Sequence, residues 1–162
     1  MIRGIIKWER KEPGENLRTR ELIFIPVLIF SLFGCRPLAA EDRACVKNVC
    51  YEIEVVSKSE ELQRGLQFRE SMPKNHGMLF VFQGMYPYPF WMKDTKIPLD
   101  MIWMDDSRRV VYIASAVPPC LKDPCPTYTP TEPALYVLEL NAGEAKRIGL
   151  EKENQVIFDL KE

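Results

Sequence analysis

The sequence predicts an α+β domain that is mainly β, with two short helices and a small curled or barrel-like sheet of about six mixed or antiparallel strands. Apolar and polar residues alternate in one segment, as expected of a strand with one face in water, and several other short apolar segments also predict strands. Most of the 13 prolines fall between Pro73 and Pro133, which favours ordered loops and short strands over long helices. With 46% apolar and 28% charged residues, the composition is that of a globular protein.

Six segments are expected to form the strands of this sheet. In the first of them, Tyr51, Ile53 and Val55 alternate with glutamates, which is the pattern of a strand with one exposed face. Two later segments flank a polar tetrapeptide and therefore predict a hairpin. The full set of expected strands is 51–55, 78–82, 99–105, 110–117, 134–140 and 155–160.

Two capping-box patterns predict the helices. Ser57 is followed three residues later by Glu60, so a short helix is expected over residues 58–64. Asn141 and Glu144 repeat the pattern and predict a second helix of about two turns. Both segments are short, so the helices are expected to cover ends or edges of the sheet.

An apolar segment near the N-terminus predicts export. Residues 22–33 carry no charge, and Arg18 and Arg20 lie immediately before them. A basic flank followed by an apolar run of this length is typical of a secretory signal peptide, and the run is shorter than the roughly 18 to 20 residues of a membrane-spanning helix. Residues 1–34 are therefore expected to form a signal or lipoprotein-type export segment, followed by a short linker with a possible hairpin over 35–49 and a single globular domain over 50–162.

Three fates of the export segment stay open. Residues 32–35 resemble the lipobox of bacterial lipoproteins, in which the cysteine, here Cys35, is acylated. Residues 38–40 offer a competing site for ordinary cleavage, and the segment can also remain uncleaved. We favour the lipoprotein interpretation, in which the acyl chains hold the domain at a membrane surface.

Four further cysteines predict two disulfide bonds. Cys45 and Cys50 are separated by four residues, as are Cys120 and Cys125, and three connectivities are formally possible. We expect the local pairs Cys45–Cys50 and Cys120–Cys125, because residues 46–49 can fold back as a hairpin and residues 118–126 are too rich in proline for a strand. A zinc site is the weaker alternative in an exported chain, so no metal or other cofactor is expected.

Five sequence motifs follow one another along the predicted domain. They are residues 63–66 with Arg69, 77–80, 90–95, 97–100 and 137–143. With these motifs the chain resembles the prokaryotic family called domain of unknown function 192, over roughly residues 50–160. The resemblance implies a compact β-rich domain, often behind an export signal, and no settled activity. Asp94 departs from the family pattern, which usually has asparagine at this position.

Residues 90–105 are the most informative segment for a functional site. Alternation along the strand 99–105 puts Asp100 on one face with Ile102 and Met104, where a carboxylate is costly unless it is paired or hydrogen-bonded. The expected partner is one of three basic residues in the same motifs. These basic residues are Arg64, Arg69 and Lys93.

Two interpretations of this segment are open. The functional one is a small pocket at a strand end, and the other is a structural ion pair or capped loop that fixes the register of the sheet, which we favour. In the functional interpretation, aromatic and apolar side chains line the pocket and charged or polar ones contact the ligand. The candidate binding residues are Arg64, Arg69, Trp91, Met92, Lys93, Asp94, Thr95 and Asp100.

Composition argues against several function classes. The formal net charge of −1 gives no electrostatic support for nucleic-acid binding. His76 is the only histidine and lies in a turn-like segment, so a catalytic triad or a histidine zinc site is not expected. Glycine-rich phosphate-binding loops are absent from the sequence.

We therefore expect an extracytoplasmic, membrane-tethered binding or accessory domain of the cell envelope, in the periplasm or at the cell surface, that contacts a small ligand or an envelope protein. One alternative is an enzyme in which Asp100 acts with Lys93 or Asp94 as an acid/base pair. The other alternative is a structural domain that supports a partner protein.

Overall fold

The computed structural model describes residues 41–161. The predicted export segment, its possible cleavage sites and the predicted acylation site Cys35 lie outside the described residues. Among the residues described, no helix is long and apolar enough to cross a membrane.

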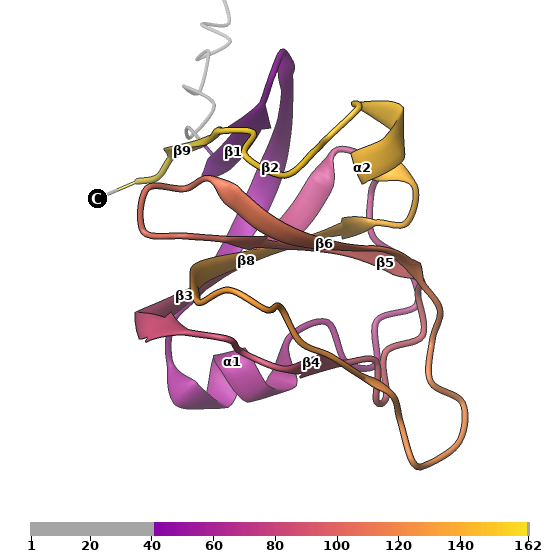
Figure 1. The fold of residues 1–162 in the computed structure, drawn as a ribbon. Coiled ribbons are helices and arrows are strands. Elements are labelled where there is room, and N and C mark those ends of the chain that lie inside the picture. The colour runs from indigo at the N-terminus through magenta and orange to yellow at the C-terminus, as the bar shows by residue number, and fades with distance from the viewer. Residues whose placement is uncertain (1–40, 162) are drawn as a thin grey trace, which may run out of the picture. The chain divides into compact units, whose positions relative to one another are not determined.

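Seven strands form one curled mixed sheet in the order β6-β5-β8-β3-β2-β1-β9 (Figure 1). All neighbouring strands are antiparallel except β2 and β3, which are parallel. The mainly β fold with a curled mixed sheet is therefore confirmed. The strands are β1 (Arg43–Val46), β2 (Val49–Val56), β3 (His76–Tyr86), β5 (Leu99–Met104), β6 (Val110–Val117), β8 (Ala134–Asn141) and β9 (Val156–Asp159).

The curl of the sheet brings its two outer strands together at one end. The Val110 N–H of β6 donates to the Asn154 carbonyl at 2.9 Å, and the Val156 N–H of β9 donates to the Arg108 carbonyl at 3.0 Å. Beyond these contacts β6 and β9 do not form a continuous ladder, and only one bridge, between Arg109 and Gln155, joins them among the described residues. The sheet is therefore a half-barrel rather than a closed barrel.

Two short strands and two short helices complete the fold. Strands β4 (Phe90–Trp91) and β7 (Thr127–Tyr128) pair as a small second sheet. Helix α1 (Ser59–Arg64) connects β2 to β3, and helix α2 (Glu144–Arg147) follows β8. Figure 1 shows α1 and β4 on one side of the curled sheet and α2 on the other.

Both predicted helices are present, but neither begins with the expected capping box. The residue before α1 is Lys58, and α2 follows Gly143, whose φ of 89° suits glycine; neither residue caps its helix with a side chain. Asn141 cannot cap α2, because it is the last residue of β8 and its amide donates to two loop carbonyls at 3.1 and 2.9 Å. Helix α2 is consequently four residues long, shorter than the two turns expected.

The core consists of two apolar clusters on opposite faces of the sheet. The first cluster contains Phe80 and Trp103 and packs against α1 and β4. The second cluster contains Leu79 and Ile102 and packs against α2. Adjacent residues of one strand thus enter different clusters, as the alternation of strand side chains requires. We call these the first face and the second face of the sheet.

Both predicted disulfide bonds are confirmed. Cys45 and Cys50 lie opposite each other on β1 and β2, with sulfur atoms 2.11 Å apart. The turn between these strands has Lys47 at a φ of 53°, so the expected hairpin is also present. Cys120 and Cys125 close the proline-flanked loop, with sulfur atoms 2.10 Å apart.

Candidate functional site

Asp100 lies on the second face and is bound by backbone amides. It is completely buried, and its two oxygens accept hydrogen bonds from the Ala116 N–H of β6 at 2.6 Å and the Ala145 N–H of α2 at 2.7 Å. The register of β5 and β6 shifts next to Asp100, which leaves the Ala116 amide free for this bond. The expectation of a basic partner for Asp100 is therefore wrong, because two amides from distant parts of the chain supply the donors.

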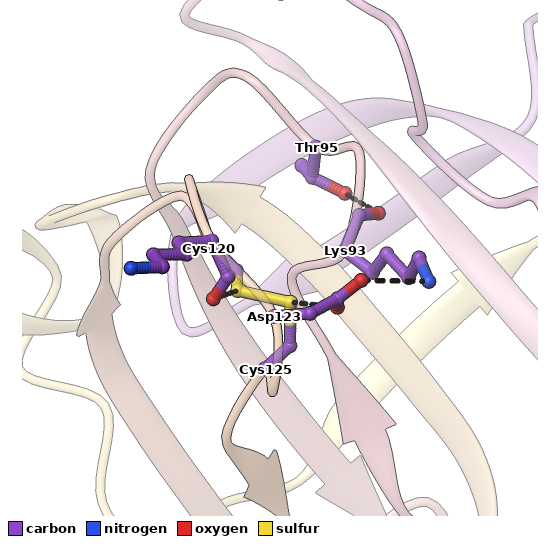
Figure 2. The surroundings of a disulfide bond; sticks show 6 residues. Lys93, Thr95, Cys120, Asp123 and Cys125 are labelled. Atoms are coloured by element: carbon purple, nitrogen blue, oxygen red, sulfur yellow. Dashed lines mark hydrogen bonds and ion pairs between the residues drawn. A yellow bond between two sulfur atoms is a disulfide. The ribbon is translucent and has the colours of Figure 1, made fainter.

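Two of the three basic candidates pair with other carboxylates. Arg69 forms a two-pronged ion pair with Glu54 of β2, and this pairing lowers the pKa of Glu54. The Lys93 amine lies 3.3 Å from Asp123, next to the Cys120–Cys125 disulfide (Figure 2). Arg64 has no ion-pair partner among the described residues.

The end of the 90–95 motif turns the chain between β4 and β5. Asp94 has a φ of 58°, and its carbonyl accepts a hydrogen bond from the Phe68 N–H at 2.7 Å. Asparagine and aspartate tolerate this left-handed conformation better than most residues, which suits the aspartate at this position. Met92 is buried in the first cluster, and Thr95 is buried beside it.

A cleft with a volume of about 930 Å³ opens on the first face, between α1, β3 and the segment around β4. Four of the eight candidate binding residues line it: Arg64, Trp91, Lys93 and Thr95. The other four candidates, Arg69, Met92, Asp94 and Asp100, do not line it. Lys93 is consequently the only member of the proposed acid/base set at this cleft, and Asp100 bonds to amides on the other face of the sheet.

Glu139 of β8 contributes a buried carboxyl to the cleft. Its side chain is on the first face, where Met78 of β3 and Met101 of β5 are its strand partners, and it is 4% exposed. The carboxyl has no hydrogen-bond or ion-pair partner among the described residues. Burial raises the pKa of Glu139 to about 8, so the free carboxyl is mostly protonated at neutral pH.

Sequence reasoning missed Glu139 although a signal was present. Residues 134–140 form an otherwise apolar strand, and alternation puts Glu139 on the same face as the buried Val137. The argument that drew attention to Asp100 therefore applies equally to Glu139. The difference is that the carboxylate of Asp100 bonds to two amides, whereas the carboxyl of Glu139 has no protein partner among the described residues and opens on the cleft.

Aromatic rings form one wall of the cleft. Phe82 and Tyr88 stack with ring centroids 3.6 Å apart, and Phe80 meets Phe90 edge-to-face with centroids 5.0 Å apart. All four rings line the cleft, and so does Trp91, which is 51% exposed. These contacts fix the ring positions before a ligand arrives.

Gly65 lets α1 approach this aromatic wall. It ends α1 with a φ of 46°, and a β-carbon at this position would lie 3.1 Å from the ring of Phe80. A larger residue would be strained by the backbone and would also push the ring. Gly65, within the Gln63–Leu66 motif, therefore sets the distance between α1 and the aromatic wall.

A smaller cleft of about 480 Å³ lies on the other side of the domain. Tyr51 donates a hydrogen bond to Glu144 at 2.8 Å, and Arg147 pairs with the same carboxylate. Burial, followed by the bond to Glu144, raises the pKa of Tyr51 to about 12. All the polar groups of this network are matched to one another, so it fits a structural role.

No group of three or more potential metal ligands occurs within residues 41–161. The fold and the larger cleft define a small, mainly β domain with one preformed aromatic-lined cavity.

The chain belongs to the domain of unknown function 192 (DUF192) family, described as "Uncharacterized ACR", whose model matches residues 42–158. No curated protein matches the chain. The fold is similar to that of a protein of unknown function from Novosphingobium aromaticivorans DSM 12444, with 31% identity and a TM-score of 0.66 over 71% of this chain and 83% of that one. It is also similar to a protein from Sinorhizobium meliloti 1021 described provisionally as a transcription regulator, with 31% identity and a TM-score of 0.65 over 72% of this chain and 91% of that one.

Proposed function

We propose that this protein is an exported, membrane-tethered domain of the cell envelope that binds a small ligand in the cleft on the first face. The observation that carries the proposal is Glu139, a buried carboxyl without a partner among residues 41–161 at a preformed aromatic cleft. The carboxyl is not sealed inside the core, since no fully buried side-chain oxygen of the described residues lacks a hydrogen bond, and it therefore faces the cleft. A polar group of a ligand can form a hydrogen bond with it there.

The dimensions and lining of the cleft support binding of a small molecule. Its volume of about 930 Å³ is within the usual range for ligand sites, which combine mostly apolar walls with a few polar groups. The aromatic wall offers apolar contact, and Glu139 with Thr95 offers polar contact. Trp91 and Arg64 line the same cavity and can contact a larger ligand.

Export and tethering rest on the sequence and on the disulfides. The two disulfide bonds are typical of proteins in oxidising compartments. The uncharged segment 22–33 and the lipobox-like Cys35 favour secretion with retention at a membrane.

An enzyme remains the second candidate, on one specific observation. A carboxyl with a pKa of about 8 suits general acid or base catalysis near neutral pH, and Glu139 has that pKa. The earlier set of Asp100, Lys93 and Asp94 is less favourable, because only Lys93 lines the cleft. Conversion of a bound ligand that Glu139→Gln abolishes would favour the enzyme over the binding domain.

The binding proposal is tested by thermal unfolding of the whole protein, purified from membranes, against sugars, peptides, amines and lipid head groups. We expect at least one class to raise the Tm of the wild type by several degrees, and Trp91→Ala to reduce that shift. Leu121→Ala is the matched control, since Leu121 is 95% exposed and does not line the cleft. A ligand whose effect survives in Trp91→Ala and Glu139→Gln alike would place binding elsewhere.

Localisation needs its own experiment. Fractionation of cells that express the whole chain is expected to find it in the membrane fraction, and Cys35→Ala is expected to release it. Thiol alkylation before lysis should leave Cys45, Cys50, Cys120 and Cys125 unmodified. Reduced cysteines in a soluble cell-interior fraction would contradict export.

A further inference from the structure

We propose that the ligand of this cleft carries a protonated amine that forms an ion pair with Glu139, while its apolar body packs against the aromatic wall. The inference rests on the proposed function, because it names the chemical class of ligand for the same cleft. It follows from the surroundings of Glu139 and from the aromatic rings that line the same cleft.

The surroundings of Glu139 hold no counter-ion. Its strand partners Met78 and Met101 are buried and apolar, and so is Val137 on the same strand and face. Desolvation by burial is the only cause of its raised pKa, so no neighbouring charge or hydrogen bond contributes. Arg64 lines the same cleft, but no hydrogen bond or ion pair among the described residues joins it to Glu139, so a ligand can supply the ionic partner of this carboxylate.

The charged groups lining the cleft come from α1 and from the segment after β4. They are Glu60 and Arg64 of α1, and Lys93 after β4. The Lys93 amine already pairs with Asp123 at 3.3 Å. Strands β3 and β5, on either side of Glu139, present no charged side chain to it, because their residues opposite it are methionines.

The aromatic wall suits a cation as well as an apolar body. Ring faces attract ammonium groups, most strongly when water is excluded. One example is already present, since the Lys93 ammonium lies 5.7 Å from the centre of the Trp91 ring. A ligand amine in the cleft would therefore be attracted both by the faces of the rings and by the Glu139 carboxylate.

A neutral hydroxyl is the alternative partner for Glu139. The two partners require different protonation states of the Glu139 carboxyl. A hydroxyl can bond to the protonated carboxyl without changing it. An ammonium group requires the carboxylate, so the proton leaves Glu139 for the solvent and the amine keeps its own. With a pKa of about 8, this makes amine affinity rise about tenfold per pH unit below 8 and level off above it.

The test is calorimetric titration of the whole protein at pH 6, 7 and 8 with three probes of one shape: 2-phenylethylamine, 2-phenylethanol and 3-phenylpropionate. We expect the amine to bind roughly tenfold or more tightly than the alcohol at pH 8. At pH 7, titrations in two buffers of different ionisation enthalpy should reveal release of about one proton per amine bound. Glu139→Gln should reduce the amine's advantage over the alcohol to within about twofold of unity.

The outcomes separate the inference from the proposed function. Equal affinity for the amine and the alcohol, or an amine preference that survives in Glu139→Gln, would overturn the amine inference and leave the binding cleft in place. Failure of all three probes, together with no stabilising ligand in the thermal screen, would overturn both. Leu121→Ala is the control for general damage, and if Glu139→Gln unfolds, Trp91→Ala replaces it, with loss of amine affinity as the expected result.

Discussion

Glu139→Gln is expected to change how the stability of the domain depends on pH. In the folded protein burial raises the pKa of Glu139 from 4.5 to about 8, so between these values the folded state holds a proton that the unfolded state has released. Stability from this group is therefore complete below pH 4.5 and is lost as the pH rises to about 8. The difference between the two pKa values corresponds to a loss on the order of 5 kcal/mol.

Urea unfolding of wild type and Glu139→Gln at pH 5, 6, 7 and 8 measures this loss. The wild type should lose roughly 1 kcal/mol or more per pH unit, and the variant should have a nearly level profile, because its amide does not ionise. The carboxyl of Glu54 does not interfere, because the ion pair with Arg69 lowers its pKa. The pH dependence of stability that comes from Glu54 therefore lies at acid pH, below the range of this titration. A level wild-type profile, or equal slopes for both proteins, would refute the description of Glu139 as a buried and unpaired acid.

Three further changes have defined outcomes. Asp100→Ala leaves two buried amides without acceptors and should lower the free energy of unfolding by about 2–5 kcal/mol in urea titrations, and a loss under 1 kcal/mol would contradict the bridging role. Gly65→Ala should lower stability by about 1–3 kcal/mol because of its positive φ, with an unchanged Tm as the contrary result. Replacing Cys120 and Cys125 together with serine should lower the free energy of unfolding by about 2 kcal/mol, with Leu121→Ala as the control. If reductant destabilises the double variant as much as it destabilises the wild type, the Cys120–Cys125 bond does not stabilise the domain.

The fold class was predictable because its signals are local. Alternating side chains identified the segment that became β2, and the polar tetrapeptide at residues 106–109 identified the hairpin of β5 and β6. Cysteine spacing identified the hairpin between β1 and β2. The short strands β4 and β7 gave no such signal, since two residues cannot alternate. Their pairing depends on the loop that the Cys120–Cys125 disulfide closes, and sequence patterns do not encode such distant contacts.

The site was only partly predictable, for a related reason. Alternation correctly put Asp100 on the face of Ile102. The donors to Asp100 are the backbone N–H groups of Ala116 and Ala145, and the sequence does not reveal them because every residue type except proline has a backbone N–H. Side-chain chemistry therefore favoured arginine or lysine as the partner of Asp100, whereas the actual donors are backbone N–H groups. Glu139 could have been found by the same alternation.

The pairing of β1 with β9 has a consequence for how the molecule is made. Ala44 of β1 lies opposite Phe158 of β9, so one edge of β1 can be paired only after β9, near the end of the described residues, has been synthesised. A nascent polypeptide therefore holds β1 with one edge uncovered, exposed to proteases and to other chains. Pairing of β9 with β1 is consequently a late step in the formation of the sheet.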